Sequence, residues 1–274
     1  MKYRLSIALV VIASCVTGCF DLDSSLFNST KLLSYTLPTT VIPESLRTQV
    51  VLSSQGKKIY GYYVRSNDVN GKFCVLYNHG NRDHLQYYWD RVALLYSMGF
   101  SVFIYDYQGY GMSEGESNEA SIHSDAVAAY AYVASLGFAD SAIAVYGFSL
   151  GGVPATYLAS SVFTPRAFIT ESAFASASTL VQSGVLLDMP GTLVMDGKYD
   201  NAELIKNVSA PKLFLHGLSD TFIDYQKNAV VLFHNAPEPK TLIPVAGANH
   251  SEVPQKMGIA IYDSTITNFI LHPN

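Results

Sequence analysis

Residues 145–152 read Val145-Tyr146-Gly147-Phe148-Ser149-Leu150-Gly151-Gly152, a stretch that places a serine among glycines. The apolar residues from Ala142 to Tyr146 lead into it and predict a short buried strand. The residues from Val153 to Ser160 follow it and predict a helix. Between them the chain has the pattern Gly-x-Ser-x-Gly, so we expect a tight turn with the serine at its tip.

Such a turn holds its serine in a strained backbone conformation and lifts the hydroxyl clear of the sheet. Neighbouring chain segments must then approach closely, which Gly147, Gly151 and Gly152 permit. The same pattern also arises by chance in turns rich in serine and glycine. The strand before it and the helix after it favour the structured turn.

The composition is typical of a well-packed globular chain. Of the 274 residues, 49% are hydrophobic and 14% are charged, which excludes a disordered chain. The net charge of −5 provides no basic surface, so we expect no nucleic-acid partner. The three cysteines offer no disulfide framework and no metal-ligand spacing with histidine. We therefore predict no metal or other cofactor.

Segments with strand and helix patterns alternate along the chain, beginning with a hairpin that turns at Gln55-Gly56. The predicted strands are Thr48–Ser53, Lys58–Val64, Phe73–Asn78, Ser101–Tyr105, Ala142–Tyr146, Arg166–Thr170, Lys212–Leu215 and Lys240–Pro244. The predicted helices are His84–Met98, Glu119–Leu136, Val153–Ser160, Tyr225–His234 and Pro254–Leu271. This order predicts an α/β fold in which helices cover both faces of a mostly parallel sheet of about eight strands.

The N-terminus does not follow this pattern. Lys2 and Arg4 precede an apolar run, Leu5 to Ala13, that is too short to span a bilayer in the ordinary way. Residues 1–18 are therefore predicted to be a secretory signal peptide. We expect residues 19–46 to form a tether and residues 47–274 to form a single domain.

The signal ends in Val16-Thr17-Gly18-Cys19, which resembles the bacterial lipobox, where the cysteine is diacylated and becomes the mature N-terminus. Cys15 also fits this pattern but would leave an unusually short signal. The alternative is a plain cleaved signal with incidental cysteines. With Cys19 as the lipidation site, we expect a protein of the bacterial cell envelope, anchored to a membrane by acyl chains.

A serine hydroxyl is a poor nucleophile at neutral pH, so Ser149 needs a base within hydrogen-bond reach and an acid that orients the base. Asp220 follows the strand Lys212–Leu215, and His250 follows the last strand in a loop of small residues. The carboxyl ends of parallel strands meet at one edge of a sheet, so we expect the three side chains to lie together. The order Ser, Asp, His is that of a known class of serine hydrolases.

The predicted acid and the predicted base each have an alternative. Asp220 could instead cap the helix that follows it, and Asp224 could be the acid. The other histidines are His79, His84, His123, His216, His234 and His272. Among all of them, only His250 follows the last predicted strand in a loop.

Two backbone N–H groups must stabilise the negative oxygen that forms when a carbonyl is attacked. Leu150 should supply one of them at the start of its helix. The second should come from the loop after the strand Phe73–Asn78, where Gly80 permits a close approach and Asn81 is the predicted donor.

Five motifs together resemble the α/β-hydrolase family. They are His79-Gly80-Asn81, the turn Asp106-Tyr107-Gln108-Gly109-Tyr110-Gly111-Met112-Ser113, the stretch Gly147–Gly152, Asp220 and His250, in that order. The first two are most similar to the Bem46-like and depalmitoylating branch and less closely to the serine-peptidase-like hydrolases. The resemblance covers residues 48–271 and implies the α/β-hydrolase fold.

Two departures limit what the resemblance implies. Ala248-Asn249-His250 stands where the branch usually carries Gly-His-Asn or a similar ending. The leader is foreign to the depalmitoylating members, so their substrate does not transfer. Asp106 and Ser113 are expected to hold their turn together by hydrogen bonds.

Substrate preference in this fold usually comes from an insertion before the acid, and residues 171–207 are the candidate. The apolar residues there could form a small lid or belong to the ordinary core; they are Phe174, Leu180, Val185, Leu186, Leu187 and Met189. A small lid favours an open cleft for short or medium acyl esters and thioesters.

We therefore expect a serine hydrolase that cleaves small-molecule esters or thioesters through an acyl-enzyme intermediate. A peptidase, an amidase or an acyltransferase with the same residues is an alternative. A further alternative is a non-catalytic scaffold lipoprotein of the envelope.

Overall fold

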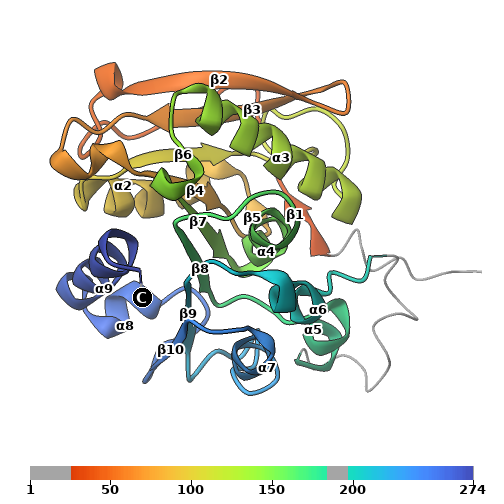
Figure 1. Ribbon diagram of the computed structural model, residues 1–274. Helices are drawn as coiled ribbons and strands as arrows, with labels where there is room; N and C mark the ends of the chain where they lie inside the picture. Colours follow the sequence, from red (N-terminus) through yellow and green to blue (C-terminus); the bar gives the residue numbers. More distant parts are fainter. Residues whose placement is uncertain (1–25, 184–196, 274) are drawn as a thin grey trace, which may run out of the picture.

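The computed structural model describes residues 26–183 and 197–273 (Figure 1). Its main sheet has eight strands in the order β10-β9-β8-β7-β4-β6-β3-β2. These strands are β2 (Arg47–Ser54), β3 (Lys57–Val64), β4 (Cys74–Asn78), β6 (Ser101–Tyr105), β7 (Ile143–Phe148), β8 (Ala167–Glu171), β9 (Lys212–Gly217) and β10 (Lys240–Val245). The hairpin β2–β3 joins β6 in antiparallel fashion, and all other neighbours are parallel. The predicted α/β fold with a mostly parallel sheet is confirmed.

Helices cover both faces of the sheet (Figure 1). They are α2 (Trp89–Ser97), α3 (Glu119–Ser135), α4 (Gly152–Ser161), α5 (Ala177–Ser183), α6 (Asn201–Leu204), α7 (Ala229–Asn235), α8 (Val253–Met257) and α9 (Ile259–Leu271). Short 3-10 turns occur at Glu44–Leu46, Val69–Lys72, Leu85–Tyr88, Asp140–Ala142, Ser149–Gly151 and Ile205–Asn207. In the described part of the chain, no helix combines the length and apolar character needed to cross a bilayer.

The core lies in two layers because side chains alternate across each strand. On β7, Val145 packs into the layer that contains residues of α3 and α4. Its neighbours Ala144 and Tyr146 pack into the layer that contains residues of α2 and α9. Every residue of β4, β6, β7, β8 and β9 is buried, as expected for strands covered on both faces.

Three predicted helices differ clearly from the structure. The segment predicted as a helix from His84 begins with the 3-10 turn Leu85–Tyr88, and α2 starts at Trp89. The segment predicted as one helix from Pro254 to Leu271 divides into α8 and α9 because Gly258, at φ 87°, takes a left-handed conformation that ends α8. The helix predicted from Tyr225 begins later, at Ala229, because residues 225–228 form a separate turn.

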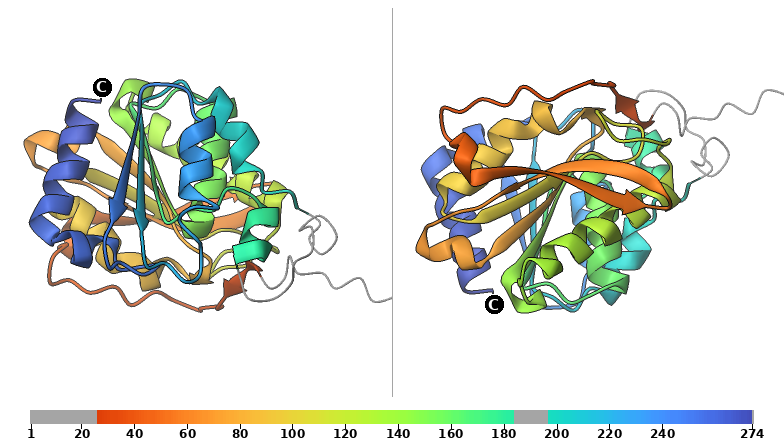
Figure 2. Two further views of the ribbon diagram at one scale, coloured as in Figure 1. Left: turned by 90° about the horizontal axis from the view of Figure 1, so that it is seen from below. Right: turned by 90° about the horizontal axis from the view of Figure 1, so that it is seen from above.

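The segment before the sheet lies against the domain. We call residues 26–37 the N-terminal strap, and Figure 2 shows it running along one edge of the molecule. Its strand β1 (Asn28–Ser29) pairs in parallel with β5 (Arg82–Asp83). This region was expected to be part of a tether, and its hydrogen bonds with the domain were not foreseen. The predicted signal peptide, Cys15 and Cys19 lie outside the described residues.

The lid prediction falls partly on described residues. Phe174 is buried in the core, and Leu180 on α5 is partly buried against it. The other four apolar residues named for the lid lie outside the described residues.

Candidate active site

Ser149 lies at the sharp turn between β7 and α4. Its φ is 53°, a left-handed conformation that is unusual for a residue other than glycine. The glycines around it are required by close packing: a Cβ on Gly147 would lie 2.5 Å from the carbonyl oxygen of Gly151, and a Cβ on Gly151 would lie 2.0 Å from that of Asn78. The start of α4 therefore rests directly on the end of β4.

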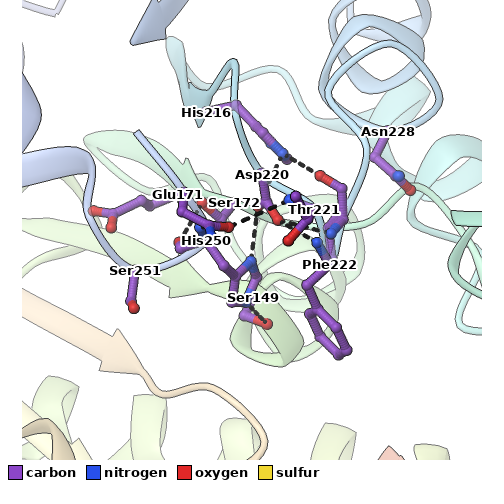
Figure 3. A network of polar contacts seen from close by, with 12 residues as sticks. Ser149, Glu171, Ser172, His216, Asp220, Thr221, Phe222, Asn228, His250 and Ser251 are labelled. Carbon is purple, nitrogen blue, oxygen red and sulfur yellow. Dashed lines mark hydrogen bonds and ion pairs between the residues drawn. The ribbon is translucent and has the colours of Figure 1, made fainter. Parts of the chain in front are cut away.

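Ser149, His250 and Asp220 form one chain of hydrogen bonds (Figure 3). The His250 Nε2 and Ser149 Oγ atoms are 2.9 Å apart. The His250 Nδ1 and Asp220 Oδ2 atoms are 2.8 Å apart. The serine is 3% exposed and the imidazole 21% exposed, so solvent reaches the chain mainly at its middle member, His250. The structure brings together the three residues that the sequence placed after three different strands.

Asp220 is held by the loop that follows β9. Its Oδ1 accepts hydrogen bonds from the backbone N–H groups of Phe222 and Ile223, so the carboxylate orders its own loop as well as contacting His250. Burial by itself raises the pKa of Asp220, but hydrogen bonds from His216 and His250 outweigh it and hold the pKa well below its ordinary value. The carboxylate is therefore ionised at neutral pH. The alternative acid, Asp224, accepts a hydrogen bond from the backbone of Lys227.

The loop after β10 holds His250 through its backbone. The Asn249 side chain accepts hydrogen bonds from the N–H groups of His250 and of Thr221, which ties this loop to that of the acid. The Ser172 hydroxyl donates to the His250 carbonyl at 2.8 Å, and the Arg91 guanidinium donates to the Ser251 carbonyl at 3.0 Å.

The loop predicted to carry the second N–H donor lies beside this turn. A Cβ on Gly80 would lie 3.0 Å from the ring of Phe148, the residue before the serine. The Asn81 side chain donates to the Leu26 carbonyl of the N-terminal strap, and the Asn81 carbonyl accepts from the Tyr110 hydroxyl. Neither contact uses the backbone N–H of Asn81. Leu150 is buried at the first turn after β7, where helix N–H groups have no partner within the helix.

Asp106 connects the strap to this loop. It accepts hydrogen bonds from the Tyr35 hydroxyl and from the Leu85 N–H, and its carboxylate lies 3.3 Å from the buried His79 ring. The Ser113 hydroxyl donates to the Asp106 carbonyl, so the hydrogen bonding expected in this turn is present.

Sequence reasoning missed several residues that support the site. The sequence offered His216 only as an alternative to His250, yet its Nε2 lies 3.4 Å from Asp220 Oδ2. Arg91 and Ser172 come from a helix and a strand end that carry no recognisable motif. No sequence pattern predicted the contacts of the strap, because a Ser- and Thr-rich segment with prolines is typical of a linker. Within the described ranges, no group of His, Cys, Asp and Glu side chains could hold a metal ion.

Known proteins with a similar sequence or fold indicate the family of this chain. A family model described as serine aminopeptidase, S33, matches residues 70–186. The chain is 30% identical over 208 residues to alpha/beta hydrolase domain-containing protein 17B of Homo sapiens, covering 73% of this chain and 68% of that protein. It is 31% identical over 191 residues to alpha/beta hydrolase domain-containing protein aho-3 of Caenorhabditis elegans, covering 67% of this chain and 54% of the relative. The chain thus spans about half the length of that relative.

Among solved structures, an esterase from Pyrococcus furiosus has a TM-score of 0.72, with 17% sequence identity, over 90% of this chain and 97% of that chain. This likeness shows a shared fold. Together with the identity to the human relative, it establishes that the chain belongs to the α/β-hydrolase superfamily. Its class is that of the serine hydrolases.

Proposed function

We propose that this protein hydrolyses carboxylic esters or thioesters by transferring the acyl group to Ser149 and then to water. The observation that carries the proposal is the continuous chain of hydrogen bonds from Ser149 through His250 to Asp220. In this mechanism Ser149 is the nucleophile, His250 is the general base, and Asp220 orients and stabilises the imidazole.

The ionised state of Asp220 fixes the direction of proton transfer. A carboxylate can only accept hydrogen bonds, so the Nδ1 of His250 carries its proton and donates it to Asp220. The Nε2 atom is then the free base that accepts the hydroxyl proton of Ser149. After acylation, the same atom activates the water that releases the acid.

The oxyanion of the tetrahedral intermediate would be held by the N–H groups of Leu150 and Asn81. Leu150 supplies a donor at the start of a helix, where the dipole also favours negative charge. Asn81 is held by hydrogen bonds of its side chain and of its carbonyl, and neither of these bonds uses its N–H. A preorganised pair of this kind is the largest single contribution to catalysis in many acyl-transfer enzymes.

The surroundings of His250 favour an apolar acyl or alkoxy group. The Phe222 ring is 47% exposed and lies 5.1 Å from the imidazole, and the Phe148 ring lies 5.4 Å from it on another side. Exposed aromatic surface at a reactive histidine offers a contact for hydrocarbon. We therefore propose small-molecule esters and thioesters with short or medium acyl chains as substrates.

A fluorophosphonate probe tests the nucleophile. We expect covalent labelling of the wild type at Ser149, and the Ser149→Ala variant should fold normally and take up no probe. A p-nitrophenyl ester panel of graded chain length then measures the acyl preference. A folded wild type that resists labelling would instead favour the non-catalytic scaffold.

Peptide bond cleavage is a second candidate because the matching family model is described as a serine aminopeptidase. The same three residues cleave both amides and esters. Aminoacyl p-nitroanilides, assayed beside p-nitrophenyl esters, separate the two activities. A higher kcat/KM for the anilides would make the protein a peptidase, and transfer of the acyl group to an added alcohol would reveal an acyltransferase.

We also propose that Cys19 is lipidated and anchors the protein in the bacterial cell envelope. The support is the lipobox-like sequence before Cys19 and the short apolar run that precedes it. In the Cys19→Ser variant, processing should stop and the mass of the acylated form should be absent. Cys15→Ser is the matched control and should mature normally. Unchanged maturation of the Cys19 variant would refute this site.

A further inference from the structure

A buried ion pair contacts the loop that carries His250. Arg91 comes from α2, and Glu171 is the last residue of β8. Their side chains are 15% and 1% exposed. The guanidinium donates two hydrogen bonds to the carboxylate, at 2.7 Å and 3.3 Å.

The carboxylate has further partners on its other side. Glu171 Oε2 accepts hydrogen bonds from the hydroxyl of Tyr146 at 2.6 Å and from that of Tyr262 at 3.0 Å. The two hydroxyls are themselves 2.7 Å apart. Burial lowers the pKa of Arg91, but the Glu171 carboxylate outweighs this effect and raises the pKa, so the guanidinium stays charged. A buried pair is costly to desolvate and is by itself weak evidence of a gain in stability.

The ion pair reaches the residues next to the nucleophile and the base. Arg91 Nη2 donates to the Ser251 carbonyl at 3.0 Å, directly after His250. The guanidinium also lies over the ring of Phe148, 5.6 Å from its centroid, directly before Ser149. One side chain therefore contacts both the base loop and the residue that leads into the nucleophile turn.

Glu171 reaches the same loop through its neighbour in the chain. Ser172, whose φ is 52°, donates its hydroxyl to the His250 carbonyl at 2.8 Å. Two successive carbonyls, those of His250 and Ser251, are thus held by the strand end and by the ion pair.

We propose that the Arg91–Glu171 pair positions His250 against Ser149, a role that rests on the hydrolase mechanism proposed above. The pair makes no contact with the reacting atoms. It holds the backbone directly after His250 and contacts the ring before the serine, and so sets the separation of Nε2 and Oγ. Small errors in that separation reduce the rate without changing how substrate is held.

The role requires arginine in particular. Its planar guanidinium donates to Glu171 through two nitrogens while one of them also donates to the Ser251 carbonyl. A lysine ammonium keeps the charge and most of the length but cannot reproduce this fork. Arg91→Lys therefore separates geometry from charge.

The test measures kcat and KM for a p-nitrophenyl ester, and the rate of fluorophosphonate labelling, in Arg91→Lys, Glu171→Gln and Ser172→Ala. We expect kcat and the labelling rate to fall at least about 10-fold in each variant, with KM within about 2-fold of the wild type. Glu203→Gln is the control, because the Glu203–Lys206 ion pair is exposed and lies on another helix. It should leave all three values unchanged.

Thermal unfolding of each variant distinguishes positioning from simple support of the fold. Lower stability with an unchanged kcat below the unfolding transition would overturn the proposal, as would a rise in KM at unchanged kcat. If the wild type itself is neither labelled nor active, the proposed function fails and this inference fails with it. If the wild type is active and only the variants show a lower kcat and labelling rate, the proposed function and this inference both stand.

Discussion

Asp220 serves two purposes with its two oxygens. Oδ1 accepts two backbone N–H groups of its own loop, and Oδ2 contacts the rings of His250 and His216. The sequence offered capping and catalysis as alternatives for this residue, whereas the geometry supports both contacts at once. A single carboxylate can do so because it has lone pairs on two oxygens.

Replacing Asp220 with asparagine tests its role at the level of a single residue. The amide can donate to His250 and so favour the wrong tautomer, and we expect kcat to fall about 10³–10⁴-fold with little change in KM. Steady-state kinetics on an ester measure this effect. Asp224→Asn is the matched control, since Asp224 contacts the backbone of Lys227. Equal losses in both variants would contradict the assignment of Asp220 as the acid.

At the level of elements, the contact between β4 and α4 depends on Gly151. A Cβ there would lie 2.0 Å from the Asn78 carbonyl oxygen, so backbone would have to move. We expect Gly151→Ala to lower the free energy of unfolding by about 3 kcal/mol or more. Gly137→Ala is the comparison: at φ 95° and with nothing within 4 Å, it should cost only about 1–2 kcal/mol of backbone strain. Urea unfolding measures both, and equal costs would contradict the role of close packing.

The contact between α3 and α4 should make stability depend on pH. The His123 ring stacks on Tyr157 with centroids 4.1 Å apart, and burial lowers the pKa of His123 to about 4. The unfolded chain, with an ordinary pKa near 6.5, therefore binds this proton first. Protonation of the unfolded chain therefore leaves the free energy of unfolding unchanged above about pH 6.5. As the pH falls toward about 4, it lowers the free energy of unfolding by at most about 3 kcal/mol.

His123→Phe keeps an aromatic ring on Tyr157 and removes the titration. We expect its free energy of unfolding to change less between pH 7.5 and pH 4.5 than that of the wild type, measured by urea unfolding at each pH. The same slope in both proteins would show that other groups cause the dependence.

At the level of the whole molecule, the N-terminal strap binds residues around the candidate site and does not act only as a linker. Removing residues 1–37 takes away the Leu26 carbonyl that holds Asn81 and the Tyr35 hydroxyl that contacts Asp106. We expect this truncation to reduce the fluorophosphonate labelling rate about 10-fold or more, because the proposed oxyanion donor, Asn81, loses its support. Removing residues 1–25 leaves the strap in place and should preserve the rate. Full activity after removal of residues 1–37 would show that the loop containing Asn81 is ordered without the strap.

The sequence was most informative where chemistry demands particular residue types. The glycines around Ser149, the order of Asp220 and His250, and the alternation of strands and helices all follow from local rules, and the fold and the three residues could be named from them. Arg91 and Ser172 could not be named, because their importance depends on which distant backbone groups they meet after folding. The split of the last helix at Gly258 depended on one residue that a helical pattern can also tolerate.

The strap has a consequence for synthesis. Residues 26–37 leave the ribosome before Asn81, Asp106 and Gly111, all of which they later bind. Contacts this distant along the chain form slowly and late. The strap of the newborn chain can therefore bind only after the loop that follows β4 has emerged, and the site stays incomplete until His250 has emerged as well.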